Sequence, residues 1–306
     1  MKKILFFSLL IVLIPYIIVT TFIQDNKIKF KFASNMSVRV KHEATGEIEN
    51  VPFEEYITGV LAGEMPVSFH IEALKAQAVA ARSYVMKRME YNVNKDYDVV
   101  DTIMNQVYLT DDYLKSVWNE TYDEKMNKIK TAVIETKGEY IEYDGEVADA
   151  FFFSTSVGAT ENSGEIFTAQ LPYLVSVESM WDAEVSPLYS TNKTFTLEEF
   201  YKKLGINYSE TIKIEKTKTT ETGRIKKIKI NGYEFTGGEV MEKLNLRSTF
   251  FEIVQNGNTV NVNNKGYGHG VGMSQYGALG MAQNGYTYDE ILEHYYSNTK
   301  ISKLKN

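Results

Sequence analysis

Cysteine is absent from this sequence of 306 residues, and histidine occurs only four times. The chain therefore has no disulfide, no thiolate ligand for zinc, no cysteine nucleophile and no lipid-modified cysteine. The histidines form no H-E-x-x-H or similar pairing, so we expect neither a metal site nor a cofactor. Basic residues are also fewer than acidic ones: the chain has 33 Lys and Arg and 40 Asp and Glu, which gives a net charge of −7. Such an acidic chain is not expected to bind nucleic acid.

An uncharged run follows the basic start Met1-Lys2-Lys3 and extends from Ile4 to Ile23. A run of about 20 residues is long enough to span a bilayer, and no small-x-small cleavage site follows it. We therefore predict a cytoplasmic start and single-pass anchor in the cell membrane over residues 1–24, and a linker over residues 25–36. Residues 37–306 then form an ectodomain outside the cytoplasm. A cleaved secretion signal is the alternative.

Two predicted helices meet at a corner that carries a carboxylate. The segment Phe53–Glu64 favours a short helix, which should end near Met65 because Pro66 disfavours the α region in the residue before it. The segment Ile71–Met89 spaces apolar side chains three and four apart and is rich in alanine, which predicts an amphipathic helix that packs closely. Glu64 thus lies at an apolar corner, where its charged form loses hydration unless a partner compensates.

The rest of the pattern mixes helices with antiparallel strands, so the predicted fold class is α+β. The dipeptide Asp144-Gly145 predicts a hairpin turn, and a β-rich subregion is expected at about 190–263. The expected strands are Ser37–Lys41, Gly138–Tyr143, Val147–Phe153 and Pro172–Val177, with a polar turn over Glu43–Asn50. The expected helices are Asp111–Thr136, Thr196–Leu204, Gly238–Leu244, Ser274–Asn284 and Tyr288–Tyr296.

Two further stretches have the composition of functional loops. The segment Ser154–Asn162 is small and polar and follows the hydrophobic Phe151-Phe152-Phe153 at the end of a predicted strand. The segment Gly266–Ala278 is rich in glycine, so its backbone can come close to a ligand or to another strand. It lacks the Lys-Ser/Thr ending of a phosphate loop and the spacing of a dinucleotide-binding turn.

Three passages of this chain are FEEYITGVLAGEMPVSFHIEALKAQAVAARSY, AFFFSTSVGATENS and GYGHGVGMSQYGALGMAQNGYTYDEIL. In these passages the chain resembles the stage II sporulation protein D family, whose wider group includes amidase-enhancer proteins. The similarity extends from about Val38 to Lys300. It implies a membrane-anchored peptidoglycan lytic transglycosylase, which cleaves the bond between N-acetylmuramic acid and N-acetylglucosamine in denuded glycan strands and leaves 1,6-anhydro ends.

The resemblance also implies a biological setting and partners. Family members act in the mother-cell engulfing membrane during engulfment in sporulation. A cell-wall amidase (stage II sporulation protein P) and a membrane protein (stage II sporulation protein M) are the partners implied by resemblance.

The resemblance further implies which residues act at the site. The catalytic acid of the family is the Glu of the A-x-E-M-P motif, here Glu64. The residues expected to bind substrate are Arg82, Gln106, Ser154, Ser156, Glu161, His269, Ser274 and Gln275. From the residues alone, structural alternatives stay open. Arg82 could form an ion pair with Glu54 or Glu55 and lock the two helices together. Gln106 and the loop serines could cap loops by hydrogen bonds. His269 could fix the glycine-rich segment by hydrogen bonds.

The sequence departs from the family pattern in two places. Many members have cysteine, or a histidine–cysteine pair, at a zinc site where this chain has Val100, Met104 and Asn105, so we expect apolar and amide contacts there. Many also have histidine where Phe153 stands, and glycine where Val157 stands. These departures favour an alternative function, a non-catalytic glycan-binding scaffold or an activator of a cell-wall amidase.

A lytic transglycosylase needs one carboxyl group. The acid gives a proton to the glycosidic oxygen and then, as carboxylate, takes one from the sugar's own 6-hydroxyl, which attacks the anomeric carbon. Because this hydroxyl is already in place at high effective concentration, no second carboxylate is needed to activate water. We expect apolar surroundings to raise the pKa of Glu64, and Arg82 to lie near the cleft without a bare ion pair to Glu64. A muramidase that uses water is a further alternative and would need Glu161 to face Glu64.

Overall fold

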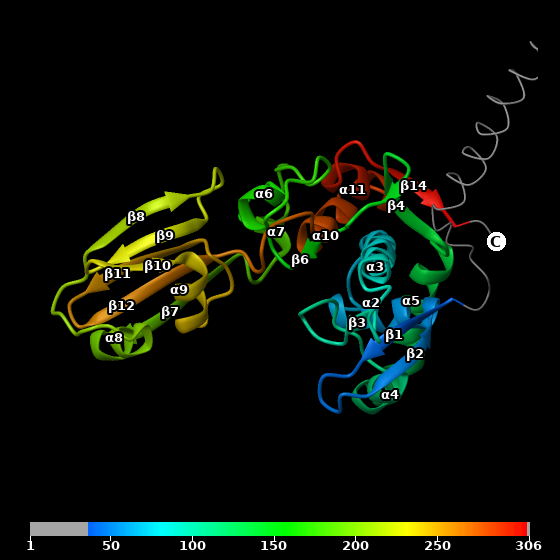
Figure 1. Ribbon diagram of the computed structural model, residues 1–306, viewed down its shortest axis with the longest axis horizontal. Coiled ribbons are helices and arrows are strands. Elements are labelled where there is room, and N and C mark those ends of the chain that lie inside the picture. Colours follow the sequence, from blue (N-terminus) through cyan, green and yellow to red (C-terminus); the bar gives the residue numbers. More distant parts are fainter. Residues whose placement is uncertain (1–35, 305–306) are drawn as a thin grey trace, which may run out of the picture. The chain divides into compact units, whose positions relative to one another are not determined.

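Helices and strands are both abundant in the structure, a computed structural model that describes residues 36–304 (Figure 1). This mixture agrees with the predicted α+β class. Within the described residues, no helix has the length and apolar character needed to cross a membrane. The predicted anchor over residues 1–24 and nearly all of the predicted linker over residues 25–36 lie outside the described residues.

Helices α2 (Phe53–Glu64) and α3 (Ile71–Tyr91) form the predicted corner. Helix α2 ends because Met65 is extended, with φ −124° and ψ 139°, as expected before a proline. Helix α3 begins after His70, whose Nδ1 accepts a hydrogen bond from the N–H of Glu72 at 3.3 Å. The small alanine side chains of α3 are buried on nearly every side, so other elements pack closely around this helix.

The first strands form a three-stranded sheet that contacts α2. Strand β1 (Ser37–Lys41) matches the prediction and pairs antiparallel with β2 (Ile48–Pro52). The polar turn predicted over Glu43–Asn50 is therefore too long, because Ile48 already pairs with Lys41. Strand β3 (Val99–Val100) pairs in parallel with the other edge of β1.

The single helix predicted over Asp111–Thr136 is broken in the structure. Helix α4 (Asp111–Trp118) ends where Asn119 has a φ of 45°, and a 3₁₀ turn, η1 (Asn119–Thr121), leads into α5 (Tyr122–Glu135). Asparagine accepts a positive φ more readily than most residues, and the apolar spacing does not reveal this break. Helix α5 buries Met126, Ile129 and Val133 in the core, and Trp118 at the end of α4 is half-buried.

The hairpin predicted around Asp144-Gly145 is confirmed, although its second strand is short. Strand β4 (Glu139–Tyr143) pairs with β5 (Glu146–Val147) on one edge and with β14 (Lys300–Lys303) on the other. The chain leaves the hairpin at Asp149, whose N–H donates to the hydroxyl of Tyr173 at 2.8 Å instead of to a strand. The next strand, β6 (Phe152–Phe153), pairs in parallel with β13 (Met273–Ser274).

The strand predicted over Pro172–Val177 is wrong, because that segment is a turn followed by irregular chain. Side chains take the N–H groups that a strand would offer to a neighbour. Asn162 Oδ1 accepts from Ser176 at 3.0 Å, and Thr160 Oγ1 accepts from Val177 at 2.9 Å. Two short helices, α6 (Ser163–Ile166) and α7 (Asp182–Val185), flank this segment.

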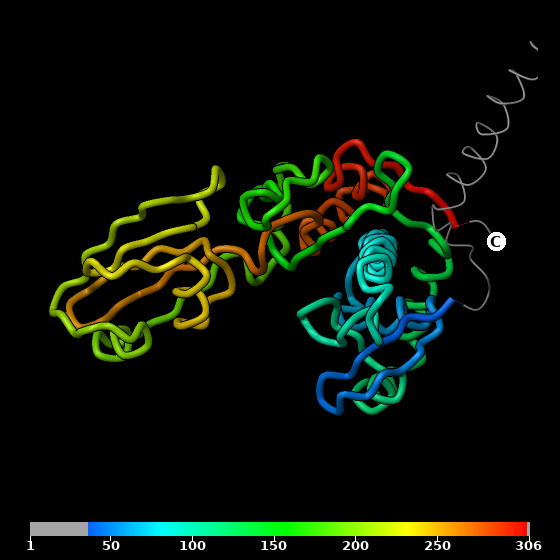
Figure 2. The backbone as a smooth tube through the Cα atoms, in the orientation of Figure 1, coloured from blue at the N-terminus to red at the C-terminus, as the bar shows by residue number. Residues whose placement is uncertain are grey.

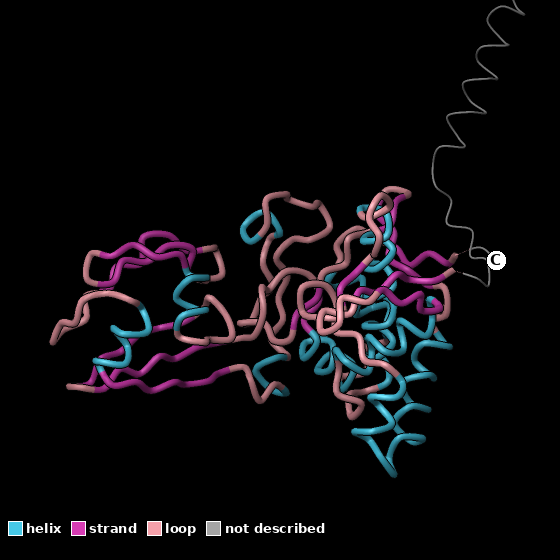
Figure 3. The backbone as a smooth tube through the Cα atoms, turned by 60° about the horizontal axis from the view of Figure 1, so that its bottom comes forward, coloured by secondary structure: helices cyan, strands magenta, loops and turns pink. Residues whose placement is uncertain are grey.

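Residues 190–265 form a β-rich part (Figure 3), and buried side chains give it a hydrophobic core of its own. Its elements are β7 (Ser190–Thr196), α8 (Leu197–Leu204), β8 (Ile214–Thr219), β9 (Ile225–Ile230), β10 (Tyr233–Thr236), α9 (Gly237–Lys243), β11 (Phe251–Asn256) and β12 (Thr259–Lys265). The strands make two antiparallel sheets, in the orders β11-β12-β7 and β10-β9-β8. Both helices begin with a threonine capping box.

The chain enters and leaves the β-rich part at neighbouring points (Figure 2). Ser190 pairs with Lys265, and the Gly266 N–H donates to the carbonyl of Tyr189 at 2.9 Å. Two helices then follow, α10 (Gln275–Gln283) and α11 (Tyr288–Tyr295), and both match predicted helices. Because α10, α11, α2, α5 and β4 all contact α3, this helix is enclosed by elements from both ends of the described chain.

Candidate active site

The Glu64 carboxyl group lies at the end of α2, where two distant segments reach it. Its Oε1 accepts a hydrogen bond from the N–H of Val107 at 2.7 Å, and its Oε2 accepts one from Gln275 Nε2 at 3.4 Å. Gly63 makes the first approach possible, because a Cβ at this position would lie 2.6 Å from the carbonyl oxygen of Val107. The sequence therefore brings backbone directly against the carboxylate.

The charge balance around Glu64 suits a group that gains and loses a proton. Burial raises the pKa of Glu64 above its usual value, and the hydrogen bonds from Val107 and Gln275 partly oppose this shift. No charged side chain among the described residues contributes to it. Because Glu64 is also partly exposed, the carboxyl group combines a raised pKa with access to a ligand.

Gln275 connects Glu64 to the central helix. Its Nε2 also lies 3.5 Å from Oε1 of Gln77, which is fully buried on α3. The Nε2 atom of Gln77 has no hydrogen-bond partner among the described residues. Gln275 was expected at the site, whereas Gln77 was missed. The available signal was a polar residue within the apolar stripe, between Leu74 and Ala81.

Aromatic side chains lie close to the carboxyl group. The negative charge of Glu64 helps burial to raise the pKa of Tyr84, and the Tyr84 ring meets that of Phe152 at 6.3 Å between centroids. Phe69 and Tyr276 form an edge-to-face pair with centroids 5.0 Å apart. Tyr84 and Phe69 are buried, whereas Phe152 and Tyr276 are partly exposed, and an exposed ring face can pack on the apolar face of a sugar.

The Arg82 side chain is held by other residues of the protein. Its guanidinium is fully buried, with Nε and one terminal nitrogen 2.9–3.2 Å from the carboxylate of Glu54. The other donors reach Thr136 Oγ1 at 3.1 Å and the Val133 carbonyl at 2.9 Å. These contacts join α2, α3 and α5 and agree with the structural alternative, while contact of Arg82 with substrate stays a prediction.

Gln106 and Ser156 are also fully buried and satisfied by the protein itself. Gln106 Oε1 accepts from the Tyr56 hydroxyl at 3.1 Å, and its Nε2 donates to the carbonyl of Ala81 at 3.4 Å. Ser156 Oγ donates to the carbonyl of Ser179 at 2.9 Å. Both residues therefore make structural contacts here, and their predicted contacts with substrate stay predictions.

Glu161 anchors the loop to the β-rich part. It is 1% exposed and forms an ion pair with Arg224, which is also 1% exposed, at 3.2 Å. Thr220 and Thr222 donate hydroxyl hydrogen bonds to the same carboxylate, and burial raises the pKa of Glu161. The carboxylate of Glu161 is thus enclosed by its protein partners, and its contact with substrate stays a prediction.

The serines of the two loops have different environments. Ser274 is fully buried, caps α10 by accepting from the Gly277 N–H at 3.2 Å, and donates to the carboxylate of Asp182. This placement gives Ser274 a structural role at the start of α10, and its predicted contact with substrate stays a prediction. Ser154 is partly exposed, and its carbonyl accepts from the Tyr276 N–H at 3.0 Å. Ser154, in the loop after β6, therefore keeps an accessible side chain beside Tyr276, the residue that follows Gln275.

His269 is packed among the rings of Phe151, Phe153 and Phe167, with centroids 5.4–6.1 Å away. Its Nδ1 accepts from the Val271 N–H at 3.0 Å. Burial lowers the pKa of His269 to about 4, and the nearby Arg224 contributes in the same direction. The neutral imidazole thus fixes the glycine-rich segment, as in the structural alternative.

Comparisons with known proteins agree with the motifs. A family model described as Stage II sporulation protein matches residues 41–143, the range that contains Glu64 and Val107. Stage II sporulation protein D of Bacillus subtilis (strain 168) is 44% identical, with 89% of this chain and 80% of the relative covered. The chain belongs to the stage II sporulation protein D family. Stage II sporulation protein D of Bacillus amyloliquefaciens is 42% identical, with 88% of this chain and 80% of that relative covered. The Amidase enhancer of Bacillus subtilis (strain 168) is 28% identical, with 80% of this chain and 40% of that protein covered.

The zinc site of the family does not fit the residues of this chain. The Met104 side chain is 77% exposed, and Asn105 is engaged on both sides, since its Oδ1 accepts from the Val100 N–H at 2.9 Å and its Nδ2 donates to Tyr84 at 3.2 Å. Nowhere in residues 36–304 do three or more ligating side chains gather as a metal site would need. An amide network thus occupies the position of the metal ligands.

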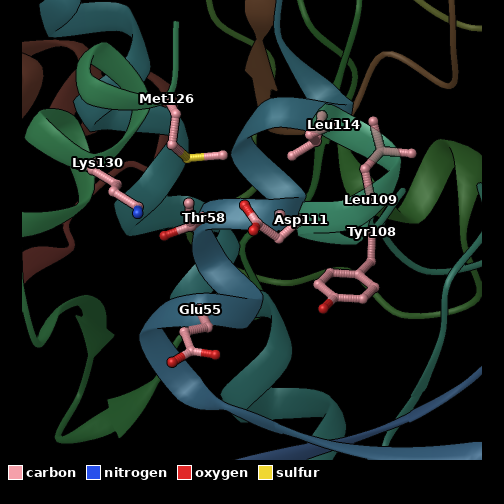
Figure 4. Close-up of a pocket in the computed structure, with 9 residues that line it drawn as sticks. Glu55, Thr58, Tyr108, Leu109, Asp111, Leu114, Met126 and Lys130 are labelled. Atoms are coloured by element: carbon pink, nitrogen blue, oxygen red, sulfur yellow. The ribbon is translucent and has the colours of Figure 1, made fainter. Parts of the chain in front are cut away.

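A cavity of about 330 Å³ opens between α2, α4 and α5 (Figure 4). Charged and apolar side chains share its lining, so it has mixed character. The lining residues are Glu55, Thr58, Gly59, Tyr108, Leu109, Asp111, Leu114, Met126 and Lys130. Because Glu64 is not among them, this cavity is separate from the site built around the Glu64 carboxyl group.

Proposed function

We propose that this chain is a peptidoglycan lytic transglycosylase in which Glu64 is the single acid and base. The observation that carries the proposal is a partly exposed carboxyl group whose pKa is raised by burial and whose partners, Val107 and Gln275, are neutral donors. Such a group can stay protonated until a substrate oxygen takes its proton. Membership of the stage II sporulation protein D family supports the same conclusion.

The proposed reaction needs only this carboxyl group and the substrate. Glu64 donates its proton to the oxygen between N-acetylmuramic acid and N-acetylglucosamine, and the bond to the anomeric carbon breaks. The resulting carboxylate, held by Val107 and Gln275, takes a proton from the 6-hydroxyl of the muramic acid as that oxygen bonds to the anomeric carbon. The product carries a 1,6-anhydro ring, and Glu64 is protonated again.

The proposed setting is the wall between two membranes during engulfment. The run Ile4–Ile23 supports attachment to the cell membrane with the described residues outside the cytoplasm. Denuded glycan is the proposed substrate, so an amidase that removes stem peptides must act first. Stage II sporulation proteins P and M are the proposed partners.

A non-catalytic glycan-binding or amidase-activating role is the second candidate. The likeness to a protein named Amidase enhancer favours it, as does Phe153 at the place of a family histidine. A muramidase that uses water has less support, because Glu161 is enclosed and paired with Arg224, and no other carboxylate in residues 36–304 contributes to the pKa of Glu64.

Digestion of denuded glycan by the purified full chain tests the proposal. We expect 1,6-anhydro ends from the wild type and none from Glu64→Gln, which keeps the shape and removes the titration. Glu165→Gln, which removes a partly exposed carboxylate paired with Lys226, is the matched control and should retain activity. Mass spectrometry distinguishes anhydro from reducing ends by one water. Reducing ends from the wild type, or anhydro ends from Glu64→Gln, would overturn the proposal.

A further inference from the structure

The hydrogen bonds between Glu64, Gln275 and Gln77 leave one buried donor without a partner. Gln275 Nε2 donates to Glu64 Oε2 at 3.4 Å and to Gln77 Oε1 at 3.5 Å. The nitrogen of Gln77 is then the unpaired atom, although Gln77 is fully buried. An unsatisfied buried N–H is rarer and more costly than an unsatisfied carbonyl. This arrangement gives the carboxylate form of Glu64 a hydrogen-bond donor but leaves Gln77 Nε2 without an acceptor among the described residues.

A half-turn of both amides gives a second arrangement that is complementary to the protonated form. The Oε1 atom of Gln275 then faces Glu64 and accepts a hydrogen bond from the protonated Oε2 of Glu64. The Nε2 atom of Gln77 donates a hydrogen bond to the same Gln275 oxygen. The buried nitrogen of Gln77 gains a partner, and its oxygen becomes the unpaired atom. Each orientation of Gln275 is compatible with one orientation of Gln77, because two nitrogens or two oxygens facing each other cannot share a hydrogen bond.

We propose that Gln77 is a positioning residue that turns the Gln275 amide in step with the loss and gain of the Glu64 proton. Gln77 contacts Gln275 and not the carboxyl group, so it acts only through Gln275. Because its nitrogen is paired only in the acid arrangement, Gln77 favours the protonated form of Glu64. The proton itself moves between Glu64 and the substrate, and the amides exchange hydrogen bonds without being oxidised, reduced or cleaved.

The other groups that face Glu64 do not compete for this role. The titratable side chains whose pKa values respond to Glu64 are Tyr56 on α2 and Tyr84 on α3, and burial raises both pKa values, so both stay neutral near neutral pH. The segment at Val107 contributes only a backbone N–H. The only side-chain partner of Glu64 among the described residues is thus Gln275.

Titration of Glu64 in the full chain, followed by carbon NMR of its carboxyl group, tests the inference without using activity. The signal is assigned by its loss in Glu64→Gln. We expect Gln77→Met, which keeps the length and removes the amide, to lower the pKa of Glu64 by about one unit, a tenfold change in the ionisation constant. Gln275→Met should raise it, because the carboxylate loses a donor.

The double variant makes the test specific. If Gln77 acts through Gln275, Gln77→Met has no further effect in a Gln275→Met background. Gln255→Met is the control, since it removes a glutamine amide that bonds Ile212 in the β-rich part and should leave the pKa of Glu64 unchanged. An unchanged pKa in Gln77→Met, or equal shifts in both backgrounds, would overturn the inference.

The role of this amide pair in turnover rests on the proposed transglycosylase function. If that function holds, the alkaline limb of the pH profile for glycan cleavage moves to lower pH in Gln77→Met, together with the pKa. If the wild type releases no anhydro ends while the pKa still shifts, the proposed function fails and the coupling between the amides stands.

Discussion

Glu64 and Glu161 are both carboxyl groups withdrawn from water, yet the protein holds them in opposite ways. Burial raises the pKa of each. Glu161 is enclosed and meets the cation of Arg224 and the hydroxyls of Thr220 and Thr222. Glu64 is partly exposed and, within the part of the chain that the structure describes, its hydrogen-bond donors are neutral. The direction of the pKa shift alone therefore does not distinguish a reactive acid from a structural anchor.

The difference lies in the charge of the partners and in access. A cation stabilises the ionised form and makes removal of either partner costly, because the remaining charge stays buried. Neutral donors stabilise the carboxylate only modestly, so the group can take up and release a proton. The family resemblance pointed to both residues, whereas their surroundings support the proposed role of Glu64 as an acid and place Glu161 at the junction with the β-rich part.

The largest expected effect separates the two residues by activity. Glu64→Gln should bring glycan cleavage below detection, because a general acid contributes about 10²-fold or more to the rate, and should leave the free energy of unfolding nearly unchanged near pH 5. Quantified anhydro ends and urea unfolding measure the two quantities. A loss of activity that merely follows a loss of folded protein would remove the distinction between Glu64 and Glu161.

Glu161→Gln should show the reverse pattern. The amide keeps an acceptor for Thr220 and Thr222 but leaves Arg224 as an unpaired buried cation, so unfolding should become easier by about 3–5 kcal/mol. Urea denaturation measures this change. The control Glu165→Gln removes a partly exposed partner of Lys226 and should alter stability little. Equal effects of the two substitutions would contradict the anchoring role of Glu161.

Arg82→Met extends the comparison to a third buried charge. The Glu54 side chain, 23% exposed, would lose its ion-pair partner, and Thr136 and Val133 would lose donors. We expect a loss of stability of about 3 kcal/mol, at the lower end for a broken buried pair because Glu54 retains some hydration. Cleavage per folded molecule should be retained. A higher KM at unchanged stability would instead support substrate binding by Arg82.

The smallest expected effect is a pH dependence of stability. Because the pKa of Glu64 is raised in the folded chain, the folded state binds more protons than the unfolded state between the unfolded and folded pKa values. The Glu64 contribution to stability is therefore complete below the unfolded pKa and is lost as the pH rises through the folded pKa. Glu64→Gln removes this loss, so its stability relative to the wild type should rise with pH. Unfolding curves across pH 4 to about 8 measure the difference, and a relative stability that falls with pH would contradict the raised pKa.

Local signals in the sequence predicted much of the fold. The proline after Met65 fixed the end of α2, and Asp144-Gly145 fixed the hairpin turn. The failures arise where side chains replace a regular pattern. Asn119 interrupts the predicted helix through its backbone conformation, and Thr160 and Asn162 take up N–H groups of the predicted strand at 172–177. Periodicity does not encode such contacts between distant residues.

The site was predicted only in part for a similar reason. Motifs identified Glu64 and Gln275, which the structure brings together. Motifs do not separate residues that touch substrate from residues that position them, so Arg82, Gln106 and Ser274 were assigned to substrate although all three are fully buried. Gln77 carried a weaker signal, a lone amide on the apolar stripe of an alanine-rich helix. Whether such an amide stabilises packing or serves a carboxyl group depends on the helix that faces it, and sequence spacing does not give this.

The pairing of Ser190 with Lys265 has a consequence for how the chain can vary. A region whose first and last residues are neighbours can be lengthened, shortened or exchanged without stretching the chain on either side. The two donors to the Glu64 carboxyl group, Val107 and Gln275, lie before and after this region in the sequence, and neither belongs to it. Selection can therefore remodel the β-rich part as a unit, as long as a substitute for the Arg224 contact to Glu161 remains where it adjoins the loop.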